Sequence, residues 1–237
     1  MVESLPDARN PRSAIGMPQR LEAWSRAHAL GVLAALIACA GFRAAWPLSL
    51  LAAPSFLWLA VVGRGVHTPS GRWGLANAVT ALRLSLVMAL IGAAPAIGHW
   101  GAVLGLSGAL LLDGLDGRLA RARGEASLFG AHFDMETDAL LVLATTLRLW
   151  QVQGFGAWVL CAGLLRYGYV ILLWFAPQVG SEAPRSRFGR HAFVISMSGL
   201  ILGLALRGGW SLGFVVLGTL TVSASFARSL YYSRFGA

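Results

Sequence analysis

The strongest constraint on the fold is a succession of long apolar segments, each separated from the next by a short polar or charged stretch. Eight such segments run along the chain: Ala27–Phe42, Trp46–Gly63, Leu75–Pro95, Trp100–Arg121, Gly130–Trp150, Phe155–Ala176, His191–Leu206 and Trp210–Arg228. A helix needs about 20 apolar residues to cross the hydrocarbon core of a bilayer. Only 12% of the residues are charged, whereas a soluble domain carries about 25%. The sequence therefore predicts an all-α fold, a polytopic membrane bundle, and excludes an ordinary soluble domain.

The apolar segments divide the chain into three parts. Residues 1–26 form a polar N-terminal segment on the cytoplasmic side, residues 27–74 form a hydrophobic hairpin with a linker, and residues 75–237 hold the last six segments. The first segment of the hairpin is short and the second contains Pro54. This pair is therefore expected either to span the membrane or to form an interfacial or re-entrant hairpin.

The basic residues, nineteen in number and all arginine, are distributed unevenly between the segments. With a cytoplasmic N-terminus, fourteen arginines fall in cytoplasmic stretches, and only Arg43, Arg148 and Arg207 fall on the opposite side. Because cytoplasmic loops of membrane proteins are enriched in positive charge, this bias predicts an even number of spans in the cell (inner) membrane, with both termini cytoplasmic. The net charge of +9 is then a topology and lipid-contact signal. Nucleic acid is not an expected partner, since the sequence contains no basic groove or stacking aromatic module.

The aspartates are concentrated at one place in the chain. Four of the five, Asp113, Asp116, Asp134 and Asp138, lie in the pattern D-x2-D-G-x2-A-R-x8-G-x3-D-x3-D. At about 100° per residue, the first pair shares one face at the end of the fourth segment. Asp134 and Asp138 are four residues apart and share a face of the next helix. A short turn around Gly124 makes the two helices antiparallel, so the carboxylates are expected to face one another at similar height.

Carboxylates that converge near a membrane interface repel one another unless a cation lies between them. Hard divalent ions prefer oxygen ligands, and four carboxylates suffice for two ions, an arrangement suited to displacement at phosphorus. The sequence therefore predicts a site for two Mg²⁺ or Mn²⁺ ions. The small residues Gly117, Ala120 and Gly130 leave room for a ligand, and the guanidinium of Arg121 suits a phosphate oxygen.

A simpler alternative is that the four aspartates pair with nearby arginines such as Arg118 and Arg123, although intramembrane acids are costly as mere structure. Two further acids, Glu125 and Glu136, are expected to point away from the shared face and to be solvated or paired. His132 is expected to be a packed or interfacial residue, because it lies about 200° round the helix from Asp134.

The aspartate pattern resembles the signature of the CDP-alcohol phosphatidyltransferases. The resemblance continues upstream in Asn77-x2-Thr80-x2-Arg83, which is similar to the start of that family's first core helix. It implies a six-helix transferase core beginning at Leu75, preceded by two additional N-terminal hydrophobic segments. Family members are homodimers, so the resemblance also implies a homodimer.

The resemblance assigns a role to each matching position. Asp113 and Asp134 would bridge two metal ions, Asp116 would complete the first site, and Asp138 would complete the second and act as the general base. The residues implied to contact the CDP-linked donor are Asn77, Thr80, Gly117, Ala120, Arg121 and Ser127. The implied reaction moves a phosphatidyl group from CDP-diacylglycerol to a small polar alcohol or alcohol phosphate, with release of CMP, in phospholipid biosynthesis.

Arginines outside the signature are candidates for contacts with an anionic acceptor. An arginine within a span is expensive and functional by default, which applies to Arg166 and to Arg83. A cytoplasmic cluster adds Arg185, Arg187 and Arg190. We expect two or three of these five to hold an alcohol phosphate. The alternatives are an internal polar partner for Arg166, and topology and lipid contact for the cluster.

Two other functions are compatible with parts of the sequence. In the first, a CDP-linked small alcohol is the donor and a lipid hydroxyl is the acceptor, which the signature does not distinguish. In the second, the protein is a divalent-cation transporter, which would place acids along a path through the membrane. The aspartates instead cluster at one end of two segments, which favours the transferase.

Overall fold

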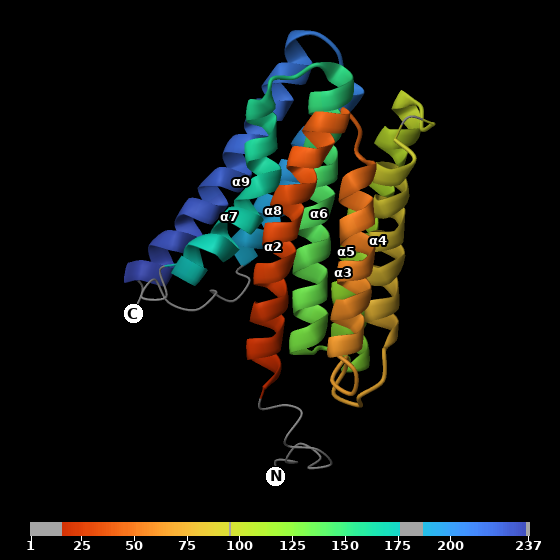
Figure 1. The fold of residues 1–237 in the computed structure, drawn as a ribbon, viewed down its shortest axis with the longest axis vertical. Helices are drawn as coiled ribbons and strands as arrows, with labels where there is room; N and C mark the ends of the chain where they lie inside the picture. Colours follow the sequence, from red (N-terminus) through yellow and green to blue (C-terminus); the bar gives the residue numbers. More distant parts are fainter. Residues whose placement is uncertain (1–15, 95, 176–186, 236–237) are drawn as a thin grey trace.

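The computed structural model describes residues 16–94, 96–175 and 187–235, and within these ranges all regular structure is helical. Eight α-helices are present there, with one 3-10 turn, η1 (Ala157–Val159), before α7 (Figure 1). The helices are α2 (Met17–Phe42), α3 (Trp46–Val62), α4 (Leu75–Gly92), α5 (His99–Arg123), α6 (Leu128–Gln153), α7 (Leu160–Phe175), α8 (Arg187–Ala205) and α9 (Gly209–Phe235). The expected fold class, a polytopic helical bundle, is confirmed.

Five of the described helices are long and apolar enough to cross a membrane: α2, α4, α7 with η1, α8 and α9. The apolar helix α3 is shorter, at 17 residues. It is continuous through Pro54 and packs against α2 and α4. Helices α5 and α6 carry the four aspartates and do not belong to this set. The protein is therefore an integral membrane protein whose two most polar long helices lie among apolar ones.

The first helix is longer than the hydropathy pattern predicts. Helix α2 begins at Met17, ten residues before the expected apolar segment at Ala27. Pro18 occupies the first turn, where a proline fits because its missing N–H would have no helical partner. Leu21 and Trp24 are buried while Glu22 is exposed. The added turns are thus amphipathic, which is why a search for apolar runs does not find them.

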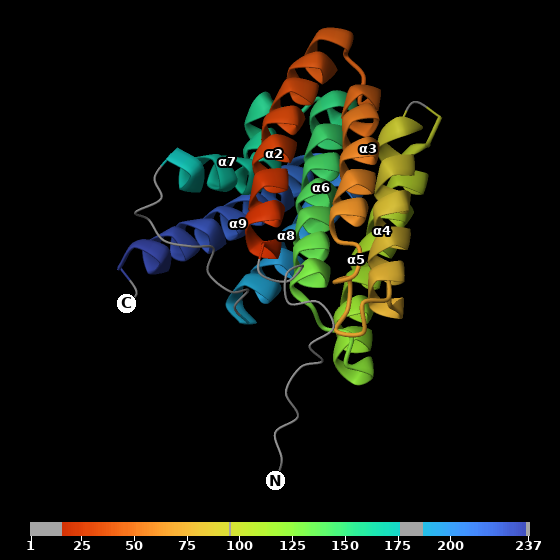
Figure 2. The ribbon, with the colours of Figure 1, turned by 60° about the horizontal axis from the view of Figure 1, so that its bottom comes forward.

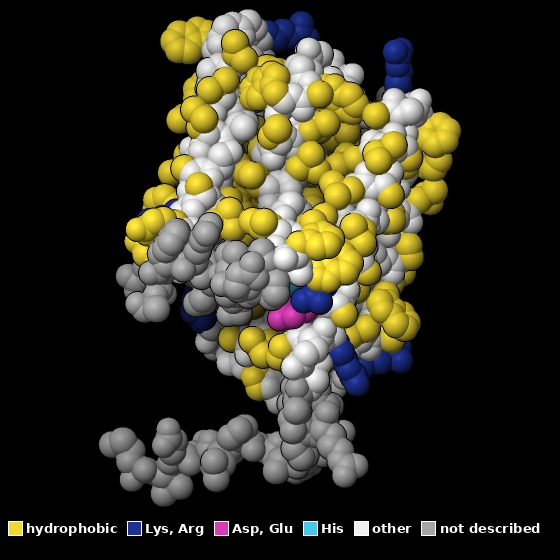
Figure 3. All heavy atoms as spheres, turned by 60° about the vertical axis from the view of Figure 1, so that its left-hand side comes forward, with side chains coloured by type: hydrophobic (Ala, Val, Ile, Leu, Met, Phe, Trp, Pro, Cys, Tyr) yellow, Lys and Arg dark blue, Asp and Glu magenta, His cyan; other side chains and the backbone are white. Residues whose placement is uncertain are grey.

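The connections alternate between the two ends of the bundle. The start of α2, the α3–α4 loop, the α5–α6 turn and the end of α9 lie toward the lower end in Figure 1, and the other described connections lie at the upper end (Figures 1 and 2). Arginines near the upper connections are Arg43, Arg148 and Arg207. On the face drawn in Figure 3, hydrophobic side chains cover the middle of the bundle, and basic side chains lie mainly toward its ends. More arginines belong to the lower connections than to the upper ones, and this is the charge asymmetry on which the predicted topology rests.

Helix α6 is the centre of the bundle. From Glu136 to Leu147 every residue is buried, and the helix contacts α2, α4, α5, α7 and α8. Threonines in this stretch are satisfied locally, as where Thr137 and Thr145 donate to backbone carbonyls one turn earlier. The position of α6 places its N-terminal turns, which carry Asp134 and Asp138, against the ends of α4 and α5.

Candidate active site

The aspartates are positioned by a tight antiparallel turn between α5 and α6. Helix α5 ends at Arg123, and its C-cap Gly124 adopts a left-handed conformation (φ 63°) that is open to glycine at little cost. Ser127 then caps α6, its side-chain oxygen accepting a hydrogen bond of 2.9 Å from the Gly130 N–H. The turn therefore sets the last turns of α5 beside the first turns of α6, as the sequence predicts.

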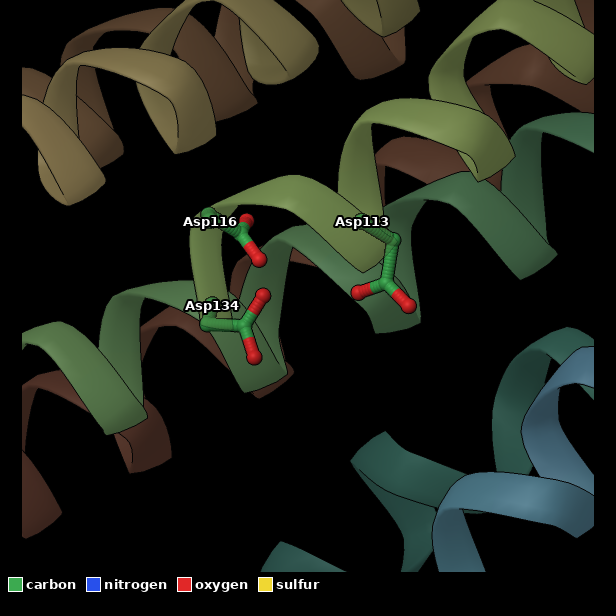
Figure 4. Close-up of side chains that lie close together, drawn as sticks. All are labelled: Asp113, Asp116 and Asp134. Atoms are coloured by element: carbon green, nitrogen blue, oxygen red, sulfur yellow. The ribbon is translucent and has the colours of Figure 1, made fainter. Parts of the chain in front are cut away.

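Three of the carboxylates converge. Asp113, Asp116 and Asp134 each offer an oxygen, and these atoms lie within 4.8 Å of one another. Figure 4 shows the Asp116 and Asp134 carboxylates approaching each other across the two helices, with Asp113 on the same side one turn along α5. Thr80 on α4 donates a hydrogen bond of 3.0 Å to Asp116. The geometry therefore brings together residues from α4, α5 and α6.

Arg83 is the internal cation of this cluster. Its side chain is fully buried, and its guanidinium contacts all four aspartates, at 2.6 Å to Asp113, 3.3 Å to Asp116, 2.5 Å to Asp134 and 3.1 Å to Asp138. The simpler alternative, that nearby arginines pair with the aspartates, thus applies to Arg83 on α4, while Arg118 and Arg123 are exposed. Arg83 is one of the five candidates for an acceptor contact, and the structure places it among carboxylates.

The cluster is chemically suited to a divalent cation. Its donors are hard carboxylate oxygens, which Mg²⁺ and Mn²⁺ prefer. Carboxylates outnumber the Arg83 guanidinium four to one, so additional positive charge would stabilise the site. The triad of Asp113, Asp116 and Asp134 could hold a metal ion. Asp138 lies one turn further along α6 and joins the triad through Arg83.

A cavity of about 880 Å³ adjoins the aspartates. Asp116 and Asp134 line it, as do all six residues expected to contact the CDP-linked donor: Asn77, Thr80, Gly117, Ala120, Arg121 and Ser127. The structure therefore gathers around one space a set of residues that the sequence distributes over three helices and a turn.

Two of these residues are held by the loop before α4. Asn77 donates to the carbonyls of His67 at 3.0 Å and Trp73 at 2.6 Å, and Ser127 donates to the same His67 carbonyl at 2.6 Å. Gly130 faces them closely, since a Cβ at this position would lie 2.9 Å from Asn77 Oδ1. The signature glycine is thus required here by a close approach between α4 and α6.

A second set of lining residues comes from α2, which the sequence did not associate with the site, and from α7, of which it named only Arg166. Helix α2 contributes Pro18, Leu21, Glu22, Ser25 and Arg26, and α7 contributes Val170, Leu173 and Trp174. The α2 residues recur at the i, i+3, i+4, i+7 and i+8 spacing of one helix face. That spacing is the only sequence signal of their common direction, and it does not reveal what the face contacts.

Beside this second set lies a buried ion pair between α6 and α7. Arg166 donates to Glu136 at 2.7 Å, and the side chains are 7% and 1% exposed. Ser25 of α2 donates to the same carboxylate at 3.0 Å and lies 2.8 Å from His132 Nε2. Glu136 is therefore paired rather than solvated, and Arg166 has the internal partner that was the alternative to an acceptor contact. His132 is packed, with its ring against Trp24.

The remaining predicted arginines differ in position. Arg190, at the start of α8, is exposed and lines the cavity. Arg185 lies outside the described residues, and so does the side chain of Arg187. Of the five candidate acceptor contacts, the structure therefore brings Arg190 to the cavity wall, while Arg83 and Arg166 form buried pairs with carboxylates.

Glu125, in the turn between α5 and α6, joins that turn to the start of α4. Its carboxylate accepts a hydrogen bond of 2.9 Å from the Ala76 N–H and one of 3.2 Å from Arg123 Nε. The Ala76 N–H, which belongs to the first turn of α4, holds the pKa of Glu125 below its ordinary value. Glu125 is thus paired, as one of the two expected alternatives: it caps the start of α4 and has Arg123 as a partner.

Together, a helical membrane bundle and a carboxylate cluster beside a cavity suit a membrane protein that binds a divalent cation next to a ligand. The chain belongs to the CDP-alcohol phosphatidyltransferase family, whose model matches residues 73–225, well over half of its length. None of the curated proteins and none of the solved structures searched gives a significant match. The family makes the protein a membrane transferase of substituted phosphate groups in phospholipid synthesis. Helices α2 and α3 lie outside the matched region.

Proposed function

We propose that this protein moves a phosphatidyl group from CDP-diacylglycerol to a small polar alcohol or alcohol phosphate and releases CMP. The observation that carries the proposal is the cavity in which Asp116 and Asp134 lie beside all six expected donor contacts. A bound nucleotide there would have its pyrophosphate next to the carboxylate cluster. The phosphatidyl transfer would therefore take place beside the part of the cavity wall that α4, α5 and α6 form.

Asp113, Asp116, Asp134 and Asp138 would hold two Mg²⁺ or Mn²⁺ ions. When bound, such ions neutralise pyrophosphate charge and stabilise the charge that develops on the leaving phosphate. The Arg83 guanidinium, which contacts all four aspartates, limits repulsion among them as the substrate enters. Arg83 thus keeps the ligands close together without contacting substrate.

The residues around the cavity position the reactants. Gly117 and Ala120 allow the donor to approach the backbone of α5, Arg121 pairs with a phosphate oxygen, and Asn77, Thr80 and Ser127 line the nucleotide region. The acceptor hydroxyl attacks the β-phosphorus in line, forming a new P–O bond as the bond to CMP breaks. Asp138 accepts the hydroxyl proton, so the products are the new phospholipid and CMP.

We infer further that both termini and the active site face the cytoplasm in the cell membrane. The arginine bias supports this orientation, since the aspartates lie at the arginine-rich end of α5 and α6. A homodimer remains a prediction from the family.

The decisive experiment supplies purified protein and Mg²⁺ with either CDP-diacylglycerol or CDP-choline. CMP release is measured with a panel of acceptors (serine, glycerol 3-phosphate, inositol 1-phosphate and diacylglycerol), and the lipid product is identified by mass spectrometry. We expect CMP and a new phospholipid from CDP-diacylglycerol only. Turnover of CDP-choline with diacylglycerol would reverse the donor assignment, and no CMP from either donor would contradict the proposed transfer.

A further inference from the structure

Helix α2 forms a wall of the substrate cavity although it lies outside the region that matches the family. Its lining residues, Pro18, Leu21, Glu22, Ser25 and Arg26, occupy one face of its first turns. The α2 contribution is therefore a property of this chain's own N-terminal hairpin rather than of the shared core.

The α2 wall and the aspartate cluster border different ends of the same cavity. Around α6 the lining runs from Asp134 through Ala131 and Met135 to His132. At about 100° per residue these positions cover roughly 160° of the helix surface. Asn77 and Ser127 line the aspartate end, while Ser25 and Arg26 line the His132 end. A donor nucleotide at the aspartate end would leave the His132 end for the other reactant, the acceptor alcohol.

Two arginines, Arg26 and Arg190, line the cavity with their charges accessible. Arg26 is paired with Glu22 at 3.4 Å, but the two side chains are 40% and 62% exposed, so solvent weakens that attraction. The Arg26 guanidinium lies 5.9 Å from the ring centre of Trp174, which also lines the cavity. Arg190 of α8 is exposed and lines the cavity as well. In contrast, Arg83 and Arg166 are buried against carboxylates.

We propose that Arg26 binds the phosphate group of a phosphorylated acceptor alcohol at the α2 end of the cavity, whose wall also carries the exposed Arg190. This inference rests on the proposed function, because in-line attack requires the acceptor to lie on the side of the β-phosphorus opposite the leaving CMP. A guanidinium binds phosphate oxygens through paired, charge-assisted hydrogen bonds. The anionic headgroup of a bulk membrane lipid offers the same chemistry, and the experiment separates the two sources.

Ser25 is a positioning residue for this contact. Its hydroxyl donates to Glu136 at 3.0 Å, and Glu136 is fixed by Arg166 at 2.7 Å. Because both partners are buried, these bonds set the rotation and depth of α2 against α6 and α7. Arg26 is the next residue along α2, so the same bonds decide where its side chain enters the cavity.

The test compares wild type with Arg26→Gln and Arg26→Lys in neutral lipid nanodiscs containing CDP-diacylglycerol. The acceptor pairs are inositol 1-phosphate with inositol, and glycerol 3-phosphate with glycerol. We expect Arg26→Gln to raise the KM for the phosphorylated acceptor about tenfold, as loss of a charge-assisted hydrogen bond implies, without changing the KM for the donor. Arg26→Lys should give an intermediate KM, since it keeps the charge and loses the planar fork. The control Arg20→Gln removes an exposed arginine of α2 that does not line the cavity, and should have no effect.

Three outcomes would overturn the inference: an unchanged acceptor KM in Arg26→Gln, an equal rise in both KM values, or a wild type that accepts only unphosphorylated alcohols. Repeating the assay with phosphatidylglycerol in the nanodiscs tests the lipid source. If the acceptor KM of wild type and Arg26→Gln differs only with the anionic lipid present, Arg26 binds the lipid headgroup and the acceptor contact is rejected.

Ser25→Ala and Ser25→Thr test the positioning role. Ser25→Ala should raise the KM for the phosphorylated acceptor, Ser25→Thr should restore it, and the Ser25→Ala/Arg26→Gln double variant should match Arg26→Gln alone. Additive effects would contradict action through Arg26. Calorimetric titration of inositol 1-phosphate into wild type and Arg26→Gln measures phosphate binding without turnover. Absence of CMP release would then count against the proposed function, while the titration would still decide the role of Arg26.

Discussion

The two ends of the cavity are assembled from the chain in different ways. The aspartate end comes from α4, α5 and α6, which follow one another directly, and its helices are set by the short turn from Gly124 to Ser127. The α2 end joins residues that are far apart, such as Ser25 and Glu136, separated by 111 positions. One end is therefore a local motif, and the other depends on how the N-terminal hairpin docks onto the core.

The charges at the two ends also differ. At the aspartate end, four carboxylates contact the guanidinium of Arg83, so that end is suited to receive further cations. Beside the α2 end, Glu136 and Arg166 balance each other one to one in a buried pair. This difference indicates that the first cluster is built to bind and the second to hold helices in place.

The largest expected effect is that of Asp134→Ala on activity. The substitution removes one of the three oxygens that could hold a metal ion, and the several kcal/mol that a metal contributes to catalysis correspond to a loss of at least about 1,000-fold. CMP release from CDP-diacylglycerol measures the loss. Size-exclusion profile and melting temperature should be retained, because Arg83 keeps its contacts with the other three carboxylates. Activity near the wild-type rate would refute the metal assignment.

Arg83→Gln tests the charge excess directly. Removing one partner from a buried ion pair costs about 3–5 kcal/mol, and here it leaves four carboxylates facing one another. We expect a lower melting temperature without Mg²⁺, and a larger stabilisation by added Mg²⁺ than in wild type, since the ion then supplies the missing positive charge. Thermal unfolding in detergent with and without Mg²⁺ measures both. An identical Mg²⁺ response in the two proteins would argue against a cation site here.

Glu136→Gln and Arg166→Gln examine the balanced pair. Each single variant breaks the buried ion pair and leaves one of its two charges in place, and should be destabilised by about 3–5 kcal/mol. The double variant removes both charges and should recover much of the loss, because the two residues are coupled. Melting temperatures of the four proteins give the coupling. Additive losses would show that the pair is not the main reason for burying these charges.

The contrast between the ends explains what the sequence could predict. The proximity of the aspartates, the gathering of the six expected donor residues around one cavity, and the helical class followed from helix periodicity and a resemblance confined to a short stretch. The place of Arg83 required knowing that α4 packs against both α5 and α6. The α2 wall could not be predicted, because the turns from Met17 to Arg26 are too polar for a hydropathy search and their partners on α6 lie more than a hundred residues away.

A smaller, local effect is expected from Gly130→Ala at the aspartate end. The new Cβ would lie 2.9 Å from Asn77 Oδ1 and 3.2 Å from Ser127 Oγ, and Asn77 is held by two backbone carbonyls. An overpacking cost of about 1–3 kcal/mol predicts a donor KM raised about tenfold, with the acceptor KM little changed. Gly213→Ala, where a Cβ meets open space, is the matched control. A rise confined to the acceptor KM would mean that the acceptor, and not the donor, binds at the aspartate end.

The smallest effect concerns Glu125, which joins the α5–α6 turn to the first turn of α4. The Ala76 N–H holds the pKa of the folded carboxyl below the ordinary value of 4.5. A carboxyl with a lowered folded pKa contributes stability that is fully present above its unfolded pKa and is lost as the pH falls through the folded value. Glu125→Gln should therefore melt slightly below wild type at pH 7, and the difference should shrink as the pH falls below about 4.5. Ser85→Ala, at an exposed hydroxyl of α4, should show no such pH dependence. A difference between wild type and Glu125→Gln that is constant from pH 7 to pH 3 would mean that the carboxylate charge does not stabilise the start of α4.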